Sequence, residues 1–243
     1  MSLDRLPPFE RTALLLDFDG TLVDLAPRPD AVVVEPGLLD TLRGLRHRLG
    51  DALAVVTGRP VDAVDAWLGD APYAVAGEHG GAVRLGPGEP LRRPDLPAPP
   101  STWLAAAERL AAAHPGALLE PKARGFALHY RAVPAAAAAF RDALAGMLAG
   151  SAAFELMAGH MLWEVRPSGV NKGSATLALM AHQPFAGRLP VFIGDDTTDE
   201  DGMRAARSLG GAGLRVDEAF GTPAGLRAWL RAAAATGAWT ALP

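Results

Sequence analysis

Residues 12–20 read TALLLDFDG, a short apolar run that ends in two aspartates and a glycine. Leu14 to Leu16 lack the three-to-four-residue spacing that marks one face of a helix. A continuous apolar run of this length is typical of a strand that is buried on both faces of a parallel sheet. The stretch therefore predicts a buried strand whose end carries charged side chains.

Further buried strands, alternating with helices, are predicted along the chain. Leucines at helical spacing predict a helix over Pro36–Leu49, with Pro36 in its first turn. The runs ALAVVTG at 52–58 and YAVAG at 73–77 repeat the buried-strand pattern, and a helix that ends near Trp67 separates them. Strand, helix, strand, helix and strand in this order are typical of parallel βαβ units.

The alternation of strands and helices is interrupted at residues 86–100, where six of fifteen residues are prolines. Such a stretch is typical of a semi-rigid connection. Beyond it, alanine-rich helices alternate with pairs of strands, which suggests a small sheet with helices on one face. The expected order is helix 101–113, strand pair 117–133, helix 134–149 and strand pair 154–167.

After Pro167 single helices and strands alternate again. The expected elements are a helix at 171–182, a strand at 189–194, a helix from 199, a strand at 213–216 and a last helix that ends near Ala235. We therefore predict an α/β fold, in which a Rossmann-like parallel-sheet core is interrupted by an inserted, smaller α+β domain. The expected limits are 1–97 for the first part of the core, 98–168 for the inserted domain and 169–243 for the second part of the core.

Composition excludes several classes of function. The 243 residues carry a formal net charge of −4, which argues against a nucleic-acid partner, because phosphate backbones require a basic surface. Without cysteine there is no disulfide framework, thiolate nucleophile, iron–sulfur cluster or cysteine zinc site. No apolar run approaches the roughly 18 residues that span a bilayer, and the N-terminal MSLDRLPPFERT lacks a secretory apolar segment. We expect a soluble cytoplasmic protein with no membrane partner.

The first candidates for function are Asp17 and Asp19, at the end of the first predicted strand. Because Gly20 turns the chain after them, both carboxylates can converge on one point at the sheet edge where open parallel sheets bind ligands. Two like charges so close are unfavourable unless a cation lies between them. A polar strand end and turn without a function would contain the same residues.

The second predicted strand ends in Thr57, Gly58 and Arg59. Thr57 is expected beside Asp17, with a hydroxyl that can donate to an oxyanion, and Gly58 permits close backbone approach. A threonine before a glycine is also a common turn, and Arg59 could be an ordinary surface arginine. Both interpretations remain open for this triplet.

Lys172 stands at the start of a predicted helix, after Asn171 as the expected N-cap. An ammonium near the positive end of a helix is unusual unless an anion shares the site. Of the 23 basic residues only Lys122 and Lys172 are lysines, and the rest are arginines. In so arginine-rich a chain, a lysine at this position favours a need for a compact ammonium over the alternative that the lysine is there by chance.

An acidic cluster, GDDTTDE at 194–200, directly follows the strand predicted at 189–194. Its four acids lie within six residues, which is more than a solvated turn needs. Carboxylate oxygens are hard ligands, and in a chain without cysteine they favour Mg²⁺ over zinc. An N-cap role would explain Asp199 but not Asp195 and Asp196.

An aspartate pair, a threonine, a lysine and an acidic cluster thus follow one another at successive strand ends. This order resembles that of the haloacid dehalogenase superfamily of aspartate-nucleophile phosphatases, and the resemblance covers most of the chain. In that superfamily an acid two residues after the nucleophile, as Asp19 stands to Asp17, is typical of phosphatases. The 114 residues between Thr57 and Lys172 would then hold a substrate-selecting cap domain.

Four stretches are similar to the trehalose-phosphatase family: GDDTTDE at 194–200, Glu78-His79-Gly80, His129-Tyr130-Arg131 and Glu164-Val165-Arg166-Pro167. The resemblance implies an enzyme, a Mg²⁺-dependent phosphoric monoester hydrolase. Its implied reaction converts trehalose 6-phosphate to trehalose and phosphate through an aspartyl-phosphate, as the last step of trehalose biosynthesis. It also implies that a separate trehalose-6-phosphate synthase supplies the substrate.

The resemblance implies a role for each motif residue. Asp17 would be the nucleophile, and Asp19 the general acid and then the general base. Thr57 and Lys172 would contact the phosphoryl oxygens. The expected Mg²⁺ ligands are Asp17, the main-chain carbonyl of Asp19 and Asp195, with Asp196 and Asp199 orienting the groups around them.

The resemblance also implies a set of substrate-binding residues, some in the core and some in the cap. At the position of His160 the family has a lysine, so a positive charge is lost near neutral pH. The implied substrate-binding residues are Gly20, Gly58, Arg59, His79, Glu120, Lys122, Arg131, His160 and Glu164.

Three other interpretations compete with this one. Another cap-bearing sugar phosphatase would act on sucrose phosphate or on a phosphoglycerate glycoside. Receiver domains of signalling proteins share a phospho-accepting Asp, an acidic pair, Thr and Lys, but their acidic pair precedes the acceptor, and they lack an equivalent of Asp19 and a cap. A non-catalytic binding protein on the same fold would be expected to have lost a motif residue, and none is missing.

Overall fold

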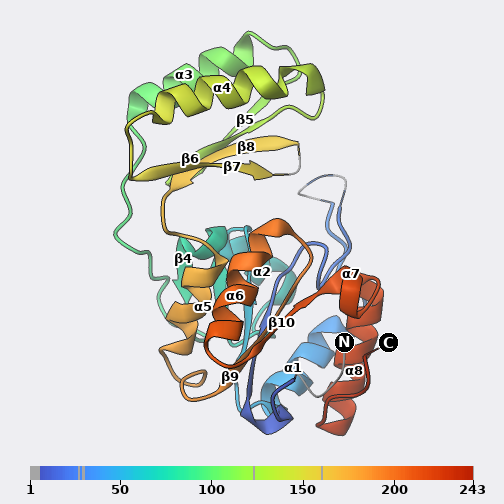
Figure 1. The fold of residues 1–243 in the computed structure, drawn as a ribbon. Coiled ribbons are helices and arrows are strands. Elements are labelled where there is room, and N and C mark those ends of the chain that lie inside the picture. The colour runs from blue at the N-terminus through green and yellow to red at the C-terminus, as the bar shows by residue number, and fades with distance from the viewer. Residues whose placement is uncertain (1–5, 27, 29–30, 123, 160, 243) are drawn as a thin grey trace. The chain divides into compact units, whose positions relative to one another are not determined.

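The chain is divided into two compact units (Figure 1). The core unit comprises Met1–Pro94 and Asn171–Pro243, and the inserted unit comprises Asp95–Val170. The structure is a computed structural model that describes residues 6–26, 28, 31–122, 124–159 and 161–242. The predicted sugar contact His160 therefore lies outside the described residues.

The core unit is built on a six-stranded sheet with β1 (Thr12–Leu16) near its middle. β1 pairs in parallel with β2 (Leu53–Val56) on one side and with β9 (Leu189–Gly194) on the other. The outer strands are β3 (Ala74–Gly77) and β4 (Ala82–Arg84) beyond β2, and β10 (Ala212–Arg215) beyond β9. β4 is the antiparallel edge strand. The predicted α/β class with a parallel sheet is confirmed.

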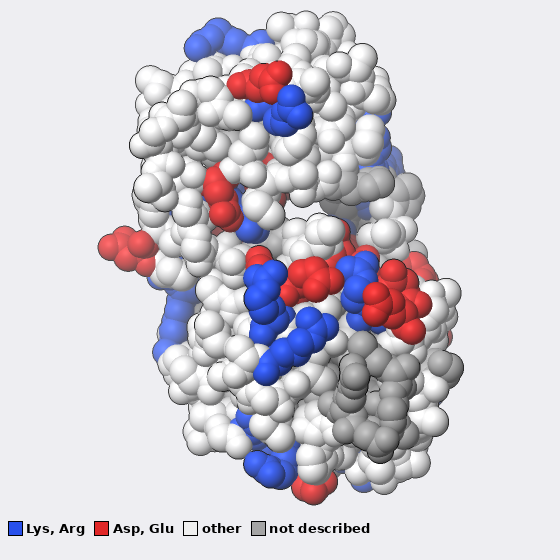
Figure 2. All heavy atoms as spheres, in the orientation of Figure 1, with Lys and Arg blue, Asp and Glu red and all other residues white. Residues whose placement is uncertain are grey.

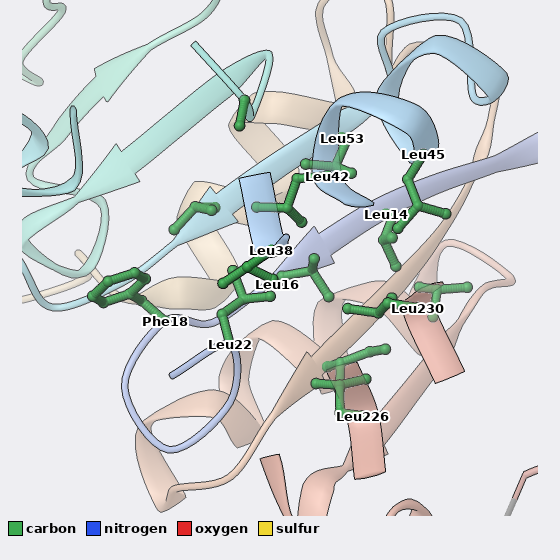
Figure 3. Packing of buried hydrophobic residues seen from close by; sticks show 14 of the residues in the cluster. Leu14, Leu16, Phe18, Leu22, Leu38, Leu42, Leu45, Leu53, Leu226 and Leu230 are labelled. Carbon is green, nitrogen blue, oxygen red and sulfur yellow. The ribbon is translucent and has the colours of Figure 1, made fainter. Parts of the chain in front are cut away.

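Helices cover both faces of this sheet, because alternate residues of each strand point to opposite sides. Leu14 and Leu16 of β1 belong to one apolar cluster, to which α1 (Leu38–Arg48), α2 (Val61–Leu68) and α8 (Pro223–Thr236) also contribute (Figure 3). Ala13 and Leu15 belong to a second cluster, with α5 (Lys172–Met180) and α6 (Glu200–Ser208). This double cover explains why the strands are continuous apolar runs.

The inserted unit is an antiparallel sheet with helices on one face (Figure 1). Its strand order is β5-β6-β8-β7, and α3 (Ser101–Ala112) and α4 (Ala137–Leu148) supply the other half of its apolar core. The predicted helices and strand pairs of this region are confirmed. The strands are β5 (Leu118–Lys122), β6 (Gly125–His129), β7 (Phe154–Gly159) and β8 (Leu162–Pro167).

The structure corrects three local predictions. α1 begins at Leu38, after Pro36, because Gly37 has φ 84°, which no α-helix accommodates. β4 was not predicted, since an edge strand of three residues has too short a pattern to detect. The strand predicted at 213–216 ends at Arg215, where the four-residue helix α7 (Val216–Ala219) begins. None of the helices among the described residues is long and apolar enough to cross a bilayer.

Candidate active site

The motif residues gather at the carboxyl edge of the core sheet. Asp17 follows β1, Thr57 follows β2 and Asp195 follows β9. These three strands are neighbours and run in parallel, so their ends meet at one edge. The amide of Asp17 also donates to the carbonyl of Ile193 at 2.9 Å, which ties the first motif to the acidic loop. This edge is where open α/β sheets bind ligands.

Lys172 makes two buried ion pairs at this edge. Its Nζ lies 2.6 Å from Oδ1 of Asp17 and 2.6 Å from Oδ1 of Asp199, and none of the three side chains is more than 5% exposed. Asn171 is the N-cap of α5, as predicted, and it forms a capping box with Ser174. The helix start therefore fixes the backbone of Lys172, and two carboxylates supply the anions that its position requires.

The cluster carries more negative than positive charge. Burial raises the pKa of Asp17 well above its ordinary value; Lys172 opposes this shift, while Asp199 and Asp195 add to it. Burial also raises the pKa of Asp195, and the charge of Asp199 adds to that effect. Burial alone would lower the pKa of Lys172, but Asp17 and Asp199 outweigh it and raise that pKa, so the side chain stays an ammonium.

A divalent cation fits this arrangement. Asp17, Asp195 and Asp199 each offer a carboxylate oxygen within 4.8 Å of the others, and such oxygens suit Mg²⁺. Burial is the largest cause of the raised pKa values of Asp17 and Asp195, and the charge of Asp199 adds to both, so a bound cation would favour their charged forms. The carboxylate of Asp199 is already engaged, because its Oδ2 accepts from the amides of Asp195 and Asp196 at 3.0 and 2.9 Å. Asp17 and Asp195 are therefore the better placed ligands.

Thr21 links these two aspartates, although the sequence reasoning assigned it no role. It is fully buried, and its hydroxyl lies 3.1 Å from Oδ1 of Asp195 and 3.4 Å from Oδ2 of Asp17. Gly20, predicted to bind substrate, has φ 73°, and a Cβ there would lie 2.2 Å from the Asp195 carboxylate. Glycine is thus required for the two loops to approach each other. The sequence feature that could have indicated Thr21 is its position directly after Gly20, at the end of the stretch DFDGT at 17–21.

The loop after β9 is held by its own side chains and by Arg215. Asp196 is exposed, and its carboxylate caps the turn at Thr197–Asp199 by accepting from the Thr197 amide at 2.5 Å. Arg215, which the sequence reasoning missed, donates to the carbonyl of Asp195 at 2.7 Å and lies 3.1 Å from Glu200. Figure 2 shows basic and acidic side chains side by side on the surface of the core unit. The backbone of Asp195 is therefore anchored at both its N–H and its C=O.

Thr57 and His79 meet at the end of β2. Thr57 is 1% exposed, and its hydroxyl accepts from the amide of Arg59 at 3.1 Å. The amide of His79 donates to the carbonyl of Thr57 at 2.9 Å, and a Cβ at Gly58 would lie 2.7 Å from the His79 ring. Glu78 and His79 both adopt positive φ, 53° and 56°, without being glycines. Such backbone strain is concentrated at functional sites.

Asp19 and Arg59 form a two-pronged ion pair. Nε of Arg59 lies 2.7 Å from Oδ2 of Asp19, and Nη2 lies 2.7 Å from Oδ1. Both side chains are partly buried, at 18% and 26% exposure. Arg59 is therefore not an ordinary surface arginine, and the structure places it on the predicted general acid.

The inserted unit brings Glu120, Lys122 and Glu164 together on the sheet face opposite its helices. Glu120 and Glu164 both stand beside Ala127 in the strand ladder, so they share this face. Lys122 Nζ lies 2.7 Å from Glu164 Oε1, and His129 Nε2 lies 2.8 Å from Glu120 Oε2. We call these four residues the polar sheet face. His129 had no predicted role, although it stands in the HYR motif.

Arg131, another predicted sugar contact, follows two residues after the end of β6 and is exposed. The structure thus describes eight of the nine predicted substrate-binding residues, all except His160. Those in the core unit lie at the sheet edge, and those in the inserted unit lie on or just after its strands. The core residues are Gly20, Gly58, Arg59 and His79, and the others are Glu120, Lys122, Arg131 and Glu164.

Comparison with known proteins identifies the family. The family profile described as Trehalose-phosphatase matches residues 15–222. A probable trehalose-phosphate phosphatase of Sinorhizobium fredii is 38% identical over 205 residues, which is 84% of this chain and 77% of that protein. The trehalose-6-phosphate phosphatase of Escherichia coli is 36% identical over 220 residues, which is 89% of this chain and 80% of that protein.

A solved structure supports the same fold. The C-terminal domain of the trehalose-6-phosphate phosphatase of C. albicans superposes with a TM-score of 0.73 at 20% identity, over 93% of this chain and 92% of that one. The profile covers both parts of the core unit, from β1 to the start of α8, and the whole inserted unit. The chain therefore belongs to the trehalose-phosphatase family.

Proposed function

We propose that this protein hydrolyses trehalose 6-phosphate to trehalose and phosphate, as the last step of trehalose biosynthesis. The observation that carries the proposal is the buried cluster in which Lys172 lies 2.6 Å from both Asp17 and Asp199 at the carboxyl edge of a parallel sheet. Membership of the family and the printed activities of the relatives support the choice of substrate. The substrate would come from a trehalose-6-phosphate synthase.

In the first half of the reaction, a carboxylate oxygen of Asp17 would attack phosphorus in line. The new bond joins Asp17 to phosphorus, and the bond between phosphorus and the sugar oxygen breaks. The ammonium of Lys172, 2.6 Å away, favours the ionised form of Asp17 that this attack requires. Asp19 would give its proton to the departing sugar oxygen as general acid.

In the second half, water would attack the aspartyl-phosphate at phosphorus. Asp19, now ionised, would take the proton of that water as general base, and Asp17 would leave as a free carboxylate. The cycle then returns the proton to Asp19. The Thr57 hydroxyl and the Lys172 ammonium would contact the phosphoryl oxygens, where charge is spread in the transition state.

We propose Mg²⁺ as the cofactor, held by Asp17, Asp195 and the main-chain carbonyl of Asp19. When bound, Mg²⁺ would neutralise Asp17 against the phosphate dianion. Thr21 and Asp199 would support the ligands: Thr21 through its contacts with both carboxylates, and Asp199 through the amide of Asp195.

We assign sugar recognition to the inserted unit. Glu120, Lys122 and Glu164 present charged groups that can bond to sugar hydroxyls, and Arg131 would add a guanidinium. These residues would distinguish trehalose 6-phosphate from other phosphorylated sugars.

The test is phosphate release with Mg²⁺ from trehalose 6-phosphate, sucrose 6-phosphate, glucose 6-phosphate and an aryl phosphate. We expect strong preference for trehalose 6-phosphate. Equal turnover of all four, or preference for sucrose phosphate, would contradict the proposed substrate while leaving the chemistry of Asp17 intact. No phosphate release from any of them would contradict the proposed activity.

A further inference from the structure

We propose that Arg59 is a positioning residue that holds the carboxyl group of Asp19 in place for hydrolysis of the aspartyl-phosphate, with Trp67 as the platform that fixes the guanidinium of Arg59. This inference rests on the proposed function, since it concerns the second half of that reaction. It differs from the role in substrate binding that the family resemblance implies for Arg59.

The contact geometry fixes the carboxyl group of Asp19. Both of its oxygens accept a hydrogen bond from the guanidinium, each at 2.7 Å. The two-pronged pair also fixes the plane of the carboxylate, which a single contact would not do.

Arg59 is itself fixed, from the core outward. Its guanidinium lies over the ring of Trp67, 5.1 Å from the centroid. Trp67 stacks on Phe18, with centroids 5.3 Å apart and an interplanar angle of 13°. Phe18 is fully buried in the apolar cluster beneath β1. Figure 3 shows Phe18 at the edge of that cluster, together with Leu16 and Leu22.

The backbone of Arg59 is also tied down. Its N–H donates to the Thr57 hydroxyl at 3.1 Å, and its carbonyl accepts from the amide of Glu78 at 2.9 Å. Phe18 lies between Asp17 and Asp19 in the sequence. It packs against Trp67, and Trp67 in turn packs against the Arg59 side chain that contacts Asp19.

The chemistry assigns the pair to the second half of the reaction. After Asp19 has given its proton to the sugar, Arg59 would keep the resulting carboxylate in the same place. In this state Asp19 must accept a proton from water as the P–O bond to Asp17 breaks. Loss of Arg59 leaves Asp19 free to rotate, so the aspartyl-phosphate should persist.

The experiment combines rapid-mixing kinetics with mass analysis of acid-quenched protein, using p-nitrophenyl phosphate, Mg²⁺ and full-length protein. The nitrophenolate leaving group of this substrate needs no proton, so formation of the aspartyl-phosphate stays fast. For Arg59→Gln we expect a burst of nitrophenol, accumulation of singly phosphorylated protein, and a steady-state kcat about 10- to 100-fold lower, the usual cost of losing a partner that orients a functional group.

Other variants sharpen the result. Arg59→Lys should show the same burst, because an ammonium cannot make both contacts. Trp67→Leu should show a smaller burst, and Trp67→Phe, which keeps a ring, a smaller one still. Arg43→Gln, which removes an exposed ion pair with Asp70, is the matched control and should behave as the wild type.

The outcomes separate this inference from the proposed function. Asp19→Asn should accumulate phosphorylated protein even if Arg59 has no role in positioning. If it does not accumulate, the proposed mechanism is wrong. If Asp19→Asn accumulates it but the Arg59 variants do not, the inference is wrong. A raised KM for Arg59→Gln with unchanged kcat and no phosphorylated protein would return Arg59 to substrate binding. If Arg59→Gln does not fold, Arg59→Lys and Trp67→Leu decide.

Discussion

The two lysines of the chain lie in contrasting surroundings. Lys172, in the core unit, is 4% exposed and contacts two carboxylates, each at 2.6 Å. Lys122, in the inserted unit, is 25% exposed and lies 2.7 Å from Glu164. The contact lengths hardly differ, but the surrounding medium does. Charges in the interior have lost their hydration and interact strongly, whereas water screens a pair that it can reach.

We expect this difference in burial to distinguish the residues that carry out the reaction from those that select the substrate. Around Lys172 the charged groups are buried in contact with one another, so replacing the lysine leaves its carboxylate partners buried without their cation. On the polar sheet face, one charged side chain can change at small cost to stability. We therefore expect the reaction to depend on the core unit and the choice of sugar to depend on the inserted unit.

Asp17→Asn tests the core unit most severely. The amide cannot form the aspartyl-phosphate, so turnover should fall by about 10⁴-fold or more, as it does when a covalent nucleophile is removed. Phosphate release measures the effect, and circular dichroism checks the fold. Asp70→Asn, the same change at an exposed carboxylate, should retain full activity. Undiminished phosphate release by Asp17→Asn would contradict the assignment of the nucleophile.

Metal removal tests the excess negative charge of the same cluster. A chelator should stop phosphate release, and added Mg²⁺ should restore it. Mg²⁺ should also raise the Tm of the wild type, because a ligand that binds only the folded state stabilises it. Asp195→Asn should lose that shift. If the Tm of the wild type is the same with and without Mg²⁺, this would argue against a metal at Asp17 and Asp195.

Replacing each lysine by alanine compares the two regions directly. Lys172→Ala should lower the free energy of unfolding by about 3–5 kcal/mol, since Asp17 and Asp199 are left buried without their cation. Lys122→Ala should lower it by about 1 kcal/mol or less. Urea unfolding at one pH measures both. Equal losses would show that burial does not distinguish the two pairs.

The smallest expected effect concerns the sugar. Lys122→Ala should raise the KM for trehalose 6-phosphate about 10-fold, the cost of one hydrogen bond to a charged group. The same variant should leave kcat/KM for an aryl phosphate unchanged. Arg141→Ala, at an exposed position of α4, is the control and should change neither. Equal losses of Lys122→Ala on both substrates would contradict the division of labour.

Much of the fold could be predicted because apolar runs and helical spacing are local patterns. The order of strands also predicted that Asp17, Thr57 and Asp195 would meet, since parallel strands end at one edge. The contacts of Thr21 and Arg215 could not be read in this way. They depend on which side chains face each other across loops that are far apart in sequence, and 174 residues separate Thr21 from Asp195.

Arg59 shows the same limit at closer range. The triplet Thr57-Gly58-Arg59 indicated a functional turn, but not which acid the arginine would bind. Its partner Asp19 is 40 residues away, and its platform Trp67 lies on α2. The packing of Trp67 on Phe18 is a contact between a helix and a loop, and the triplet contains no trace of it.

The most direct test of the central claim is to locate the phosphoryl group. Asp19→Asn, mixed with p-nitrophenyl phosphate and Mg²⁺, is quenched in acid, digested and mapped by mass spectrometry. We predict one phosphoryl group on the peptide that contains Asp17, formed within the first turnover. A phosphoryl group on another residue, or none while nitrophenol is released at the wild-type rate, would contradict the account.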